Sequence, residues 1–517
     1  MADGIKDNLQ HDIQVQPSDR KVVKDNLEKE KKLGDKPVAV IGTHTRVMTG
    51  RKVITSSVKK ITRANVVDVV MKAYAVHQKN RDDINYLTNY YCGIQPILHK
   101  TKQVRPEINS VVRENRAQEI VDFKVGYSYG EPVQYVSKVS DEKVSKDVST
   151  LNDYMDVQNR DSFDVELAKW QMVCGLGYKL ALPALTGEES PFDVCIPDPR
   201  DTFIVYDNTV RHRPLVGVIY TEDPETASIT FGAYADGMYY EIAGMEIVKS
   251  QPLYLPGIPL VEYPLNSERM GAFEPVLDLL DAINEVDSNR LDGIKQFIQS
   301  LAVAVNCQFK DGTTANDIRQ AGMIVLKSVG ENKADFKILS EQLNQTETQT
   351  LKNDMMDAVR EIVGMPAQGN ARTGDSSNNG AVILRNGWEA AEARAKAYDK
   401  LFRKSEMQFL KIVLAYCPDL HISRLQIKIQ PTRSQYEDIY TKAQVLNLLL
   451  GNKYVHPKVA YAASNMFSDV ENAYQMGIKW ADEQEAKAAK QAEAEAKASE
   501  TPKPAVETEP AKGADPE

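Results

Sequence analysis

The feature of this sequence that most constrains the fold is a long helical pattern from Ala381 to Tyr416. Its apolar and small residues follow a strict 4-3-4-3 spacing: Leu384, Trp388, Ala391, Ala395, Tyr398, Phe402, Ser405, Phe409, Ile412 and Tyr416. At about 1.5 Å per residue, such a helix is roughly 54 Å long. A seam of this length packs against another helix or a sheet over its whole course. A coiled coil and the spine of a large globular body both fit. Ser405 and the two alanines favour the spine.

A long polar loop, Met365–Asn379, precedes this helix. Helix–helix connections are usually only a few residues, so a Gly/Asn/Ser loop of this length is either disordered or functional. Its segment from Gly369 to Ser376 nearly matches the phosphate-binding pattern G-x-x-x-x-G-K-[ST]. In that pattern a lysine neutralises phosphate, but here Asp375 stands at the lysine position, and a helix precedes the segment where a strand is required. A nucleotide site is therefore excluded.

Two helical patterns flank a small module before the loop. The first runs from Glu274 to Leu301 and the second from Thr348 to Val363. Between them the sequence predicts strands and one short helix: strands at 302–309, 323–327 and 336–339, and a helix at 314–320. The first helix leads to the compact module, and the second helix leads back from it. This describes a stalk with a tip, which needs neighbouring copies to bury its apolar faces.

The chain as a whole is predicted to be α+β and predominantly helical. Residues 1–35 are of mixed charge and are expected to be mobile. The remaining elements are β-like runs at 37–57, helices at 65–76, 113–129 and 150–185, antiparallel β structure at 192–262, and helices at 435–450 and 458–476. From Asp482 to Glu517, an Ala/Glu/Lys/Pro composition without aromatics predicts a disordered acidic tail.

Composition limits the classes of function. No apolar run is long enough to span a bilayer, and the polar N-terminus is not expected to be a secretory signal. Half of the net charge of −10 lies in the tail, which has ten acidic residues and five lysines. The segment from Lys36 to Val67 instead holds seven basic residues and no acidic one. Nucleic-acid attraction and a solvated strand edge both explain that segment, and the strand edge is favoured.

The candidate chemical sites are few. The seven histidines are scattered, and no metal or other cofactor is expected. Asp198, Asp201 and Asp207 suggest a metal-dependent nuclease, but Asp-Pro and Asp-Asn are common turn formers, and the turn interpretation is favoured. One helix face carries an acidic stripe: Asp278, Asp281, Glu285 and Asp292. Such a stripe is either a solvated face or, in a ring of stalks, the lining of a channel that lets DNA slide.

Several segments in a fixed order resemble portal proteins of long-tailed bacteriophages, especially those of Gram-positive hosts. They are Tyr90–Leu98, Arg105–Asn109, Asn115, Ile120–Asp122, Val125–Pro132, Tyr263–Pro264 with the polar stretch after it, Gly271 with the helix Glu274–Arg290, and Asn379–Ala381. The resemblance covers roughly residues 40–480, and the order of the segments is more specific than any one of them.

The resemblance implies a dodecameric ring at one capsid vertex, through which DNA is packaged and later ejected. The implied parts are a wing (36–272), stem helices (273–300 and 346–364), a clip (301–345), a tunnel loop (365–380), a spine helix with a wing strand (381–430) and a helical crown (431–481). In the tunnel loop, the implied contacts to the DNA backbone are Asn370, Arg372, Asn378 and Asn379.

The implied partners are other copies of the chain, double-stranded DNA bound without sequence preference, the terminase large subunit, a head-completion or adaptor protein, and the major capsid and scaffolding proteins. No membrane is involved. The residues implied to face the motor and the head-completion protein are Asn316, Asp317 and Arg319 in the clip. The implied location is the virion, after assembly in the host cytoplasm. The protein would not be an enzyme. The alternatives are a metal-dependent DNA-processing enzyme that uses Asp198, Asp201 and Asp207, and a monomeric scaffold.

Overall fold

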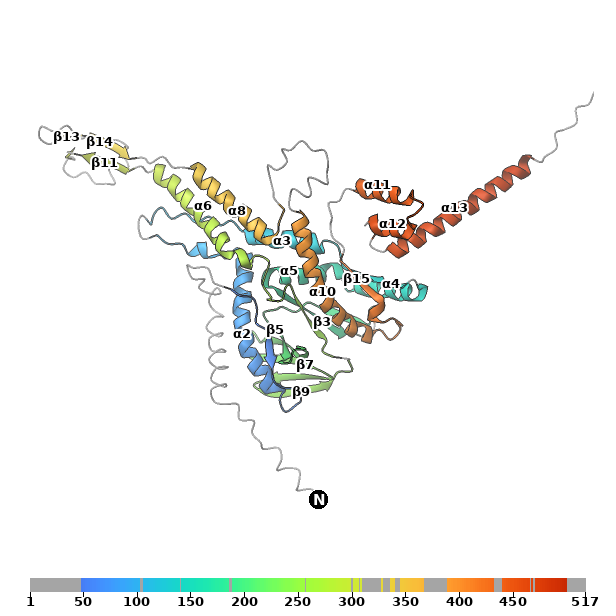
Figure 1. Cartoon of the computed structure of the whole chain (residues 1–517). Coiled ribbons are helices and arrows are strands. Elements are labelled where there is room, and N and C mark those ends of the chain that lie inside the picture. Colours follow the sequence, from blue (N-terminus) through green and yellow to red (C-terminus); the bar gives the residue numbers. More distant parts are fainter. Residues whose placement is uncertain are drawn as a thin grey trace, which may run out of the picture. The chain divides into compact units, whose positions relative to one another are not determined.

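The structure is a computed structural model, and its fold is α+β and predominantly helical, as predicted (Figure 1). It describes residues 48–499 except 103–105, 140, 186–187, 256, 299–300, 306, 309–326, 329–334, 340–344, 367–387, 432–438, 465 and 468–469. The chain forms two compact units, one of 1–135 with 146–434 and one of 136–145 with 435–517. Among the described residues, no helix is both long and apolar enough to cross a membrane.

A six-stranded sheet forms one layer of the first unit. Its strands, in spatial order, are β1 (Ile54–Ser56), β5 (Thr202–Asp207), β6 (Pro214–Glu222), β7 (Ile229–Ala235), β8 (Met238–Ala243) and β9 (Glu246–Pro252). β1 is parallel to β5, and the other pairs are antiparallel, as expected for 192–262. Helix α2 (Val66–Tyr91) packs on the sheet through Val70 and Tyr74. It is longer than predicted because Ile84, Leu87 and Tyr90 continue its buried face.

A second, three-stranded sheet has the order β10 (Leu260–Pro264), β3 (Leu176–Pro183), β4 (Phe192–Cys195). The helices of this region are α3 (Arg116–Tyr129), α4 (Glu142–Val157) and α5 (Arg160–Cys174). The predicted helix at 150–185 is therefore wrong beyond Cys174. Gly175 ends α5 with a φ of +83°, a conformation that glycine adopts at no steric cost, and the chain continues as a buried strand.

Helix α10 (Trp388–Tyr416) is the predicted spine over its described length. It packs against β10 and β3. The seam is buried at Ala391, Ala395, Phe402, Ser405, Phe409 and Ile412. The spine interpretation is thus confirmed over a coiled coil for this part, and residues 381–387 lie outside the described residues. Two short elements near α10 are η3 (Arg424–Gln426) and β15 (Ile427–Gln430), and β15 pairs with β2 (Gln134–Ser137).

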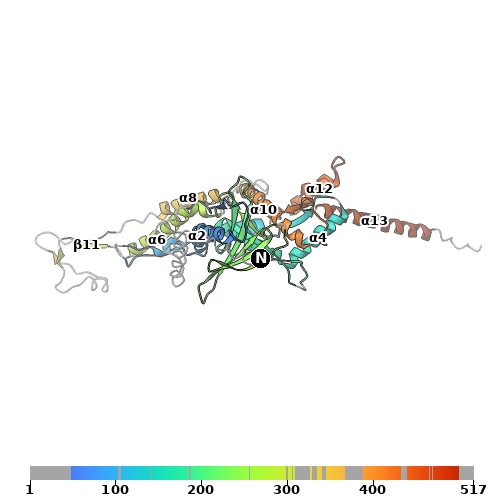
Figure 2. The same ribbon diagram turned by 90° about the horizontal axis from the view of Figure 1, so that it is seen from below.

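The predicted stalk helices are a pair, α6 (Leu277–Ile298) and α8 (Gln345–Val363), with the short η2 (Glu274–Val276) leading into α6. Figure 1 and Figure 2 both show α6 and α8 side by side. Between them, β11 (Leu301–Val305) pairs antiparallel with β14 (Asp335–Leu339), and β12 (Cys307–Gln308) pairs with β13 (Lys327–Ser328). The predicted strands at 302–309 and 336–339 are largely present. The predicted helix at 314–320 lies outside the described residues.

The second unit consists mainly of α11 (Ile439–Leu450), α12 (Pro457–Ser464) and α13 (Val470–Ser499). The single helix predicted at 458–476 is instead divided between α12 and α13. The prediction of a disordered tail from Asp482 is wrong as far as Ser499, because α13 continues through it. Ala, Glu and Lys are strong helix formers, so this sequence extends a helix even where its side chains are exposed.

Candidate functional site

A ladder of side-chain bonds fixes α6 to the extended segment Ser110–Glu114. Three alternate backbone N–H groups of the segment donate to three side chains of α6. They are Ser110 N to Asp292 Oδ1 (2.6 Å), Val112 N to Ser288 Oγ (3.0 Å) and Glu114 N to Asn284 Oδ1 (2.7 Å). Two extended residues advance about 6.6 Å, and four helical residues advance about 6.0 Å, so the two repeats match over this short length. We call these three bonds the ladder.

Segments that carried the portal resemblance meet at the first half of α6. The Tyr90 hydroxyl donates to Asp281 (2.8 Å), and the ring of Tyr90 stacks on Phe273. The Asn284 amide donates to Gln95 Oε1 (2.7 Å), and Gln95 in turn donates to Asn115 (3.0 Å). Gln95 and Asn284 are fully buried, so each amide needs these partners. These segments therefore hold the start of α6.

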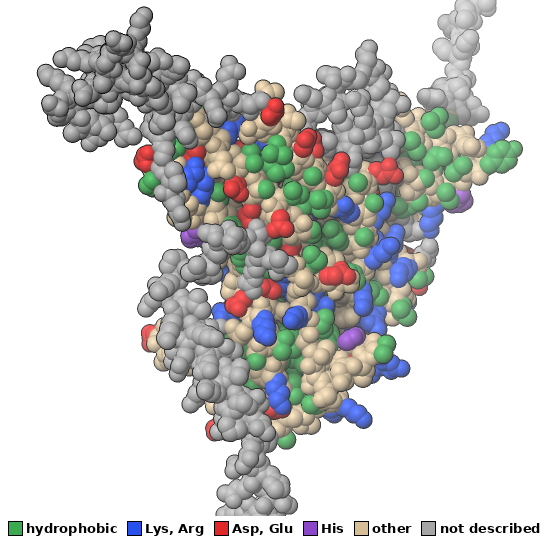
Figure 3. Space-filling model, turned by 60° about the vertical axis from the view of Figure 1, so that its left-hand side comes forward, with side chains coloured by type: hydrophobic (Ala, Val, Ile, Leu, Met, Phe, Trp, Pro, Cys, Tyr) green, Lys and Arg blue, Asp and Glu red, His purple; other side chains and the backbone are tan. Residues whose placement is uncertain are grey.

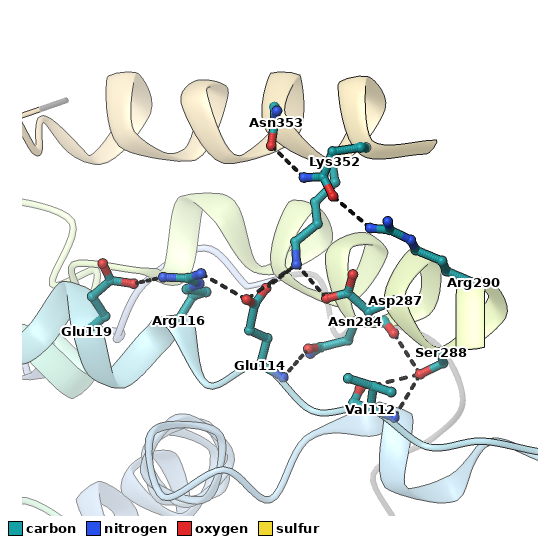
Figure 4. A network of polar contacts seen from close by, with 11 residues as sticks. Val112, Glu114, Arg116, Glu119, Asn284, Asp287, Ser288, Arg290, Lys352 and Asn353 are labelled. Carbon is teal, nitrogen blue, oxygen red and sulfur yellow. Dashed lines mark hydrogen bonds and ion pairs between the residues drawn. The ribbon is translucent and has the colours of Figure 1, made fainter. Parts of the chain in front are cut away.

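A polar network joins both stalk helices to α3 (Figure 4). Lys352 of α8 pairs with Asp287 of α6 (2.9 Å) and with Glu114 (3.3 Å). Arg116 pairs with Glu114 (2.8 Å) and with Glu119 (2.5 Å). Partial burial opposes ionisation of Glu114, but hydrogen bonds and charge from Arg116 and Lys352 lower its pKa below the ordinary value. The Glu114 carboxylate thus links α8 to α3, and Lys352 extends the network to α6.

The acidic stripe does not behave as one surface. Asp278 and Glu285 are exposed, and Asp281 is half-buried beside Tyr90. Asp292 is buried and accepts bonds from Lys102 and from Lys100 (3.1 Å). Burial raises the pKa of Asp292, but these lysines and the Ser110 bonds lower it well below its usual range. Asp292 therefore differs from the expected solvated or channel-lining carboxylate, because it accepts the ladder bond from the Ser110 N–H.

Two cations cap the end of α8, where the long polar loop begins. Lys124 Nζ donates to the Val363 carbonyl (2.7 Å), and Arg394 donates to the carbonyls of Ile362 and Glu361. The last carbonyls of a helix lack partners within it and carry partial negative charge, so cations are favourable there. Burial, and then the charge of Arg394, lower the pKa of Lys124 to about 8. We call Lys124 and Arg394 the loop-root clamp.

The clamp brings three elements to one point. Lys124 belongs to α3, its acceptor ends α8, and Arg394 lies in the first turns of α10. Close by, Tyr127 of α3 donates to Glu392 of α10 (2.8 Å), and its ring contacts Trp388. The end of α8 and the start of α10 are therefore both held by α3. The expected tunnel-loop residues lie outside the described residues: Asn370, Arg372, Asn378 and Asn379. The same applies to the expected clip residues: Asn316, Asp317 and Arg319.

The three candidate nuclease carboxylates have separate local partners. Asp198 pairs with Arg200, and Asp201 with Arg81 (3.5 Å). Asp207 accepts a hydrogen bond from Thr209 Oγ1 (2.8 Å), and such local bonds from an aspartate to the residues after it are typical of turns. In the part of the chain that the structure describes, no group of three His, Cys, Asp or Glu side chains is placed to hold a metal ion. The turn interpretation of these residues is confirmed at Asp207.

A buried ionic cluster ties α10 to the sheet beneath it. Lys179 of β3 donates to Asp164 (2.9 Å) and Glu406 (3.4 Å), and Glu406 also accepts from the hydroxyls of Tyr263 (2.6 Å) and Tyr135. The Lys179 ammonium also lies over four aromatic rings: Phe163, Tyr263, Phe402 and Phe409. Burial opposes its charge, but Asp164 and Glu406 raise its pKa.

Sequence reasoning missed the clamp, Lys352 and the ladder as a unit. Two signals were available: Asp292 of the ladder was part of the acidic stripe, and Asn115, next to Glu114 and Arg116, was among the resembling residues. Charged side chains also separate by sign on the face drawn in Figure 3, where Lys and Arg gather toward the right and Asp and Glu toward the upper left.

Comparison with known proteins gives a family match over most of the chain. The family model described as "Phage portal protein, SPP1 Gp6-like" matches residues 72–499, from α2 to the end of α13. None of the proteins with curated descriptions matches. Similar solved structures include "Neck of empty GTA particle computed with C6 symmetry", with 10% identity and a TM-score of 0.40 over 68% of this chain and 90% of that chain. Another is "Virion of native gene transfer agent (GTA) particle", with 10% identity and a TM-score of 0.39 over 74% and 94%. Both TM-scores are too low to support an argument.

Proposed function

The chain belongs to the SPP1 Gp6-like family of phage portal proteins, and from this membership we propose that it forms the DNA channel at one capsid vertex. Copies would assemble as a dodecameric ring through which the genome is packaged and later ejected. The match over residues 72–499 carries the proposal, because it includes both stalk helices and the spine. The chain itself would catalyse nothing, and a partner motor would supply the work.

We further propose the part boundaries implied by the resemblance. The wing is 36–272, the stem 273–300 with 346–364, the clip 301–345, the tunnel loop 365–380, and the crown 431–481. In the wing and stem, the ladder and the network around Lys352 support a stem that is fixed firmly to the wing. The clip would dock the terminase large subunit and later a head-completion protein.

Exposed apolar side chains on the stem helices support assembly of several copies. They are Leu291 and Ile294 on α6, and Leu351 and Ile362 on α8, each between 37% and 52% exposed. Single exposed apolar residues are ordinary, but four on one helix pair leave an apolar surface that a neighbouring copy would cover. Negative-stain images of the purified protein test this proposal. We expect rings with a central hole, and a stable monomer at all concentrations would contradict it.

The proposed tunnel loop makes a separate prediction. Arg372→Ala, or deletion of Gly374–Asn379, should leave rings intact and impair packaging or retention of DNA, because the loop would contact the DNA backbone by charge. The measurement is the amount of nuclease-protected DNA per particle. Thr373→Ala in the same loop is the matched control. Normal packaging by both the Arg372 and the deletion variants would exclude the tunnel-loop assignment.

A further inference from the structure

The exposed side of α10 carries basic residues and no acidic ones between Lys396 and Lys411. The exposed cations are Lys396, Lys400, Arg403, Lys404 and Lys411, which we call the cationic ridge. At about 100° per residue they fall within roughly 100° of arc, directly opposite the buried seam. The two acidic residues of this stretch, Asp399 and Glu406, are both buried. The exposed charges of this stretch of the spine are thus all positive.

Four of these cations have no anionic partner within the described chain. Lys396 pairs with Glu392 (3.2 Å). Among the described residues, no ion pair or hydrogen bond engages the side chains of Lys400, Arg403, Lys404 or Lys411. Arg424 adds a further guanidinium, because it donates to the carbonyl of Met407 on the same side of α10 (3.2 Å). The stem differs, since Lys352 there has two carboxylate partners.

This arrangement costs the isolated helix some stability. Lys400 lies four residues from both Lys396 and Lys404, and like charges at this spacing destabilise a helix. Opposite charges four residues apart, as Glu483 and Lys487 in the exposed part of α13, avoid that cost. A polyanion that spans the ridge would turn this repulsion between the cations into a net attraction to the ligand.

The ridge fits a nucleic-acid backbone. From Lys396 to Lys411 it is roughly 22 Å long, and duplex DNA carries one negative charge per about 1.7 Å of its axis. Lysines on flexible stems and one arginine suit phosphate contacts without base readout. α10 is also the first described helix after the proposed tunnel loop in the sequence.

We propose that the cationic ridge of α10 is a second, sequence-independent contact for the phosphate backbone of double-stranded DNA. This inference rests on the proposed function, because it takes DNA as the natural polyanion near the ring. It assigns binding to described residues of the spine helix, outside the tunnel loop. Each ridge cation that meets a phosphate releases counterions, so binding would weaken steeply with salt.

The test compares two matched triple variants of the full chain. The first is Lys400→Gln with Arg403→Gln and Lys404→Gln, which removes ridge charge and keeps strong helix formers. The second is Lys59→Gln with Lys60→Gln and Arg63→Gln, which removes the same residue types from another exposed basic segment. Binding of a fluorescent random-sequence duplex is followed by anisotropy between about 50 and 200 mM salt, and rings are imaged in parallel.

We expect the ridge variant to form rings and to lose roughly tenfold or more in affinity, with the slope of log K against log salt reduced by about 1 per cation lost. The control variant should keep the wild-type slope. Lys400→Arg with Lys404→Arg should also keep it, because the charge is retained.

An unchanged slope in intact rings of the ridge variant would overturn the proposal and leave the portal function standing. Loss of rings in that variant, with rings kept in the control, would also overturn it, because the ridge would then be a contact between copies. A wild-type chain that forms no ring contradicts the proposed function, and its anisotropy series still decides whether the ridge binds DNA.

Discussion

At the scale of single residues, Lys124 shows how a buried cation can serve a helix end. The residue is 6% exposed, and the acceptor of its ammonium is a backbone carbonyl rather than a carboxylate. Without a full negative charge beside it, desolvation dominates and lowers the pKa to about 8. Lys179 is also buried but has two carboxylate partners, and its pKa is raised. The partner thus decides the direction of the shift.

Lys124 gives a pH-dependent prediction. Between about pH 8 and its ordinary value of 10.5, the unfolded chain holds a proton on Lys124 that the folded chain has released. The contribution of Lys124 to the free energy of unfolding therefore rises with pH in this window, by about 3 kcal/mol at most. Lys124→Met should lack this rise. Urea titrations of wild type and variant at several pH values measure it.

The control for this prediction is Lys352→Met, because the pKa of Lys352 is raised and its contribution does not grow with pH. Equal pH slopes for wild type and Lys124→Met across the window would contradict the assignment of the buried ammonium.

At the scale of elements, the helices were predictable where apolar periodicity was strong, as in α6, α8 and α10. The ladder was not, because an extended segment has no period of its own to read and its partners lie 170 to 182 residues away. The strand β3 was missed because a strand buried on both sides has no alternating pattern. Helical α13 was missed because a composition typical of disorder is also one of strong helix formers.

The ladder makes a prediction at this scale. Ser288→Ala removes the middle acceptor and leaves the Val112 N–H without its side-chain partner, which should cost about 1–3 kcal/mol. Hydrogen exchange should accelerate at Ser110–Glu114 more than in α6 itself. The control is Thr350→Ala, which also removes a hydroxyl but on the exposed side of α8. It should leave exchange at Ser110–Glu114 unchanged. Faster exchange throughout α6 instead would mean that Ser288 acts within its helix only.

At the scale of the molecule, the two compact units predict two unfolding transitions. Lys179 lies at the junction of α5, β3 and α10 in the first unit, and the second unit contains α11–α13. Lys179→Met leaves two buried carboxylates uncompensated, which typically costs about 3–5 kcal/mol. Calorimetry should show one transition moved to lower temperature and the other unmoved. Lys146→Met, an exposed change on α4, is the control, and an equal shift of both transitions would contradict independent units.

The spacing of the ladder also limits how α6 can slide. A helix repeats its face every four residues, so the next register in which three side chains meet three N–H groups lies about 6 Å along the axis. Any smaller displacement breaks all three bonds at once and gains none. The axial positions of α6 relative to the segment 110–114 are therefore discrete. A force along the helix axis would move α6 and the segment together.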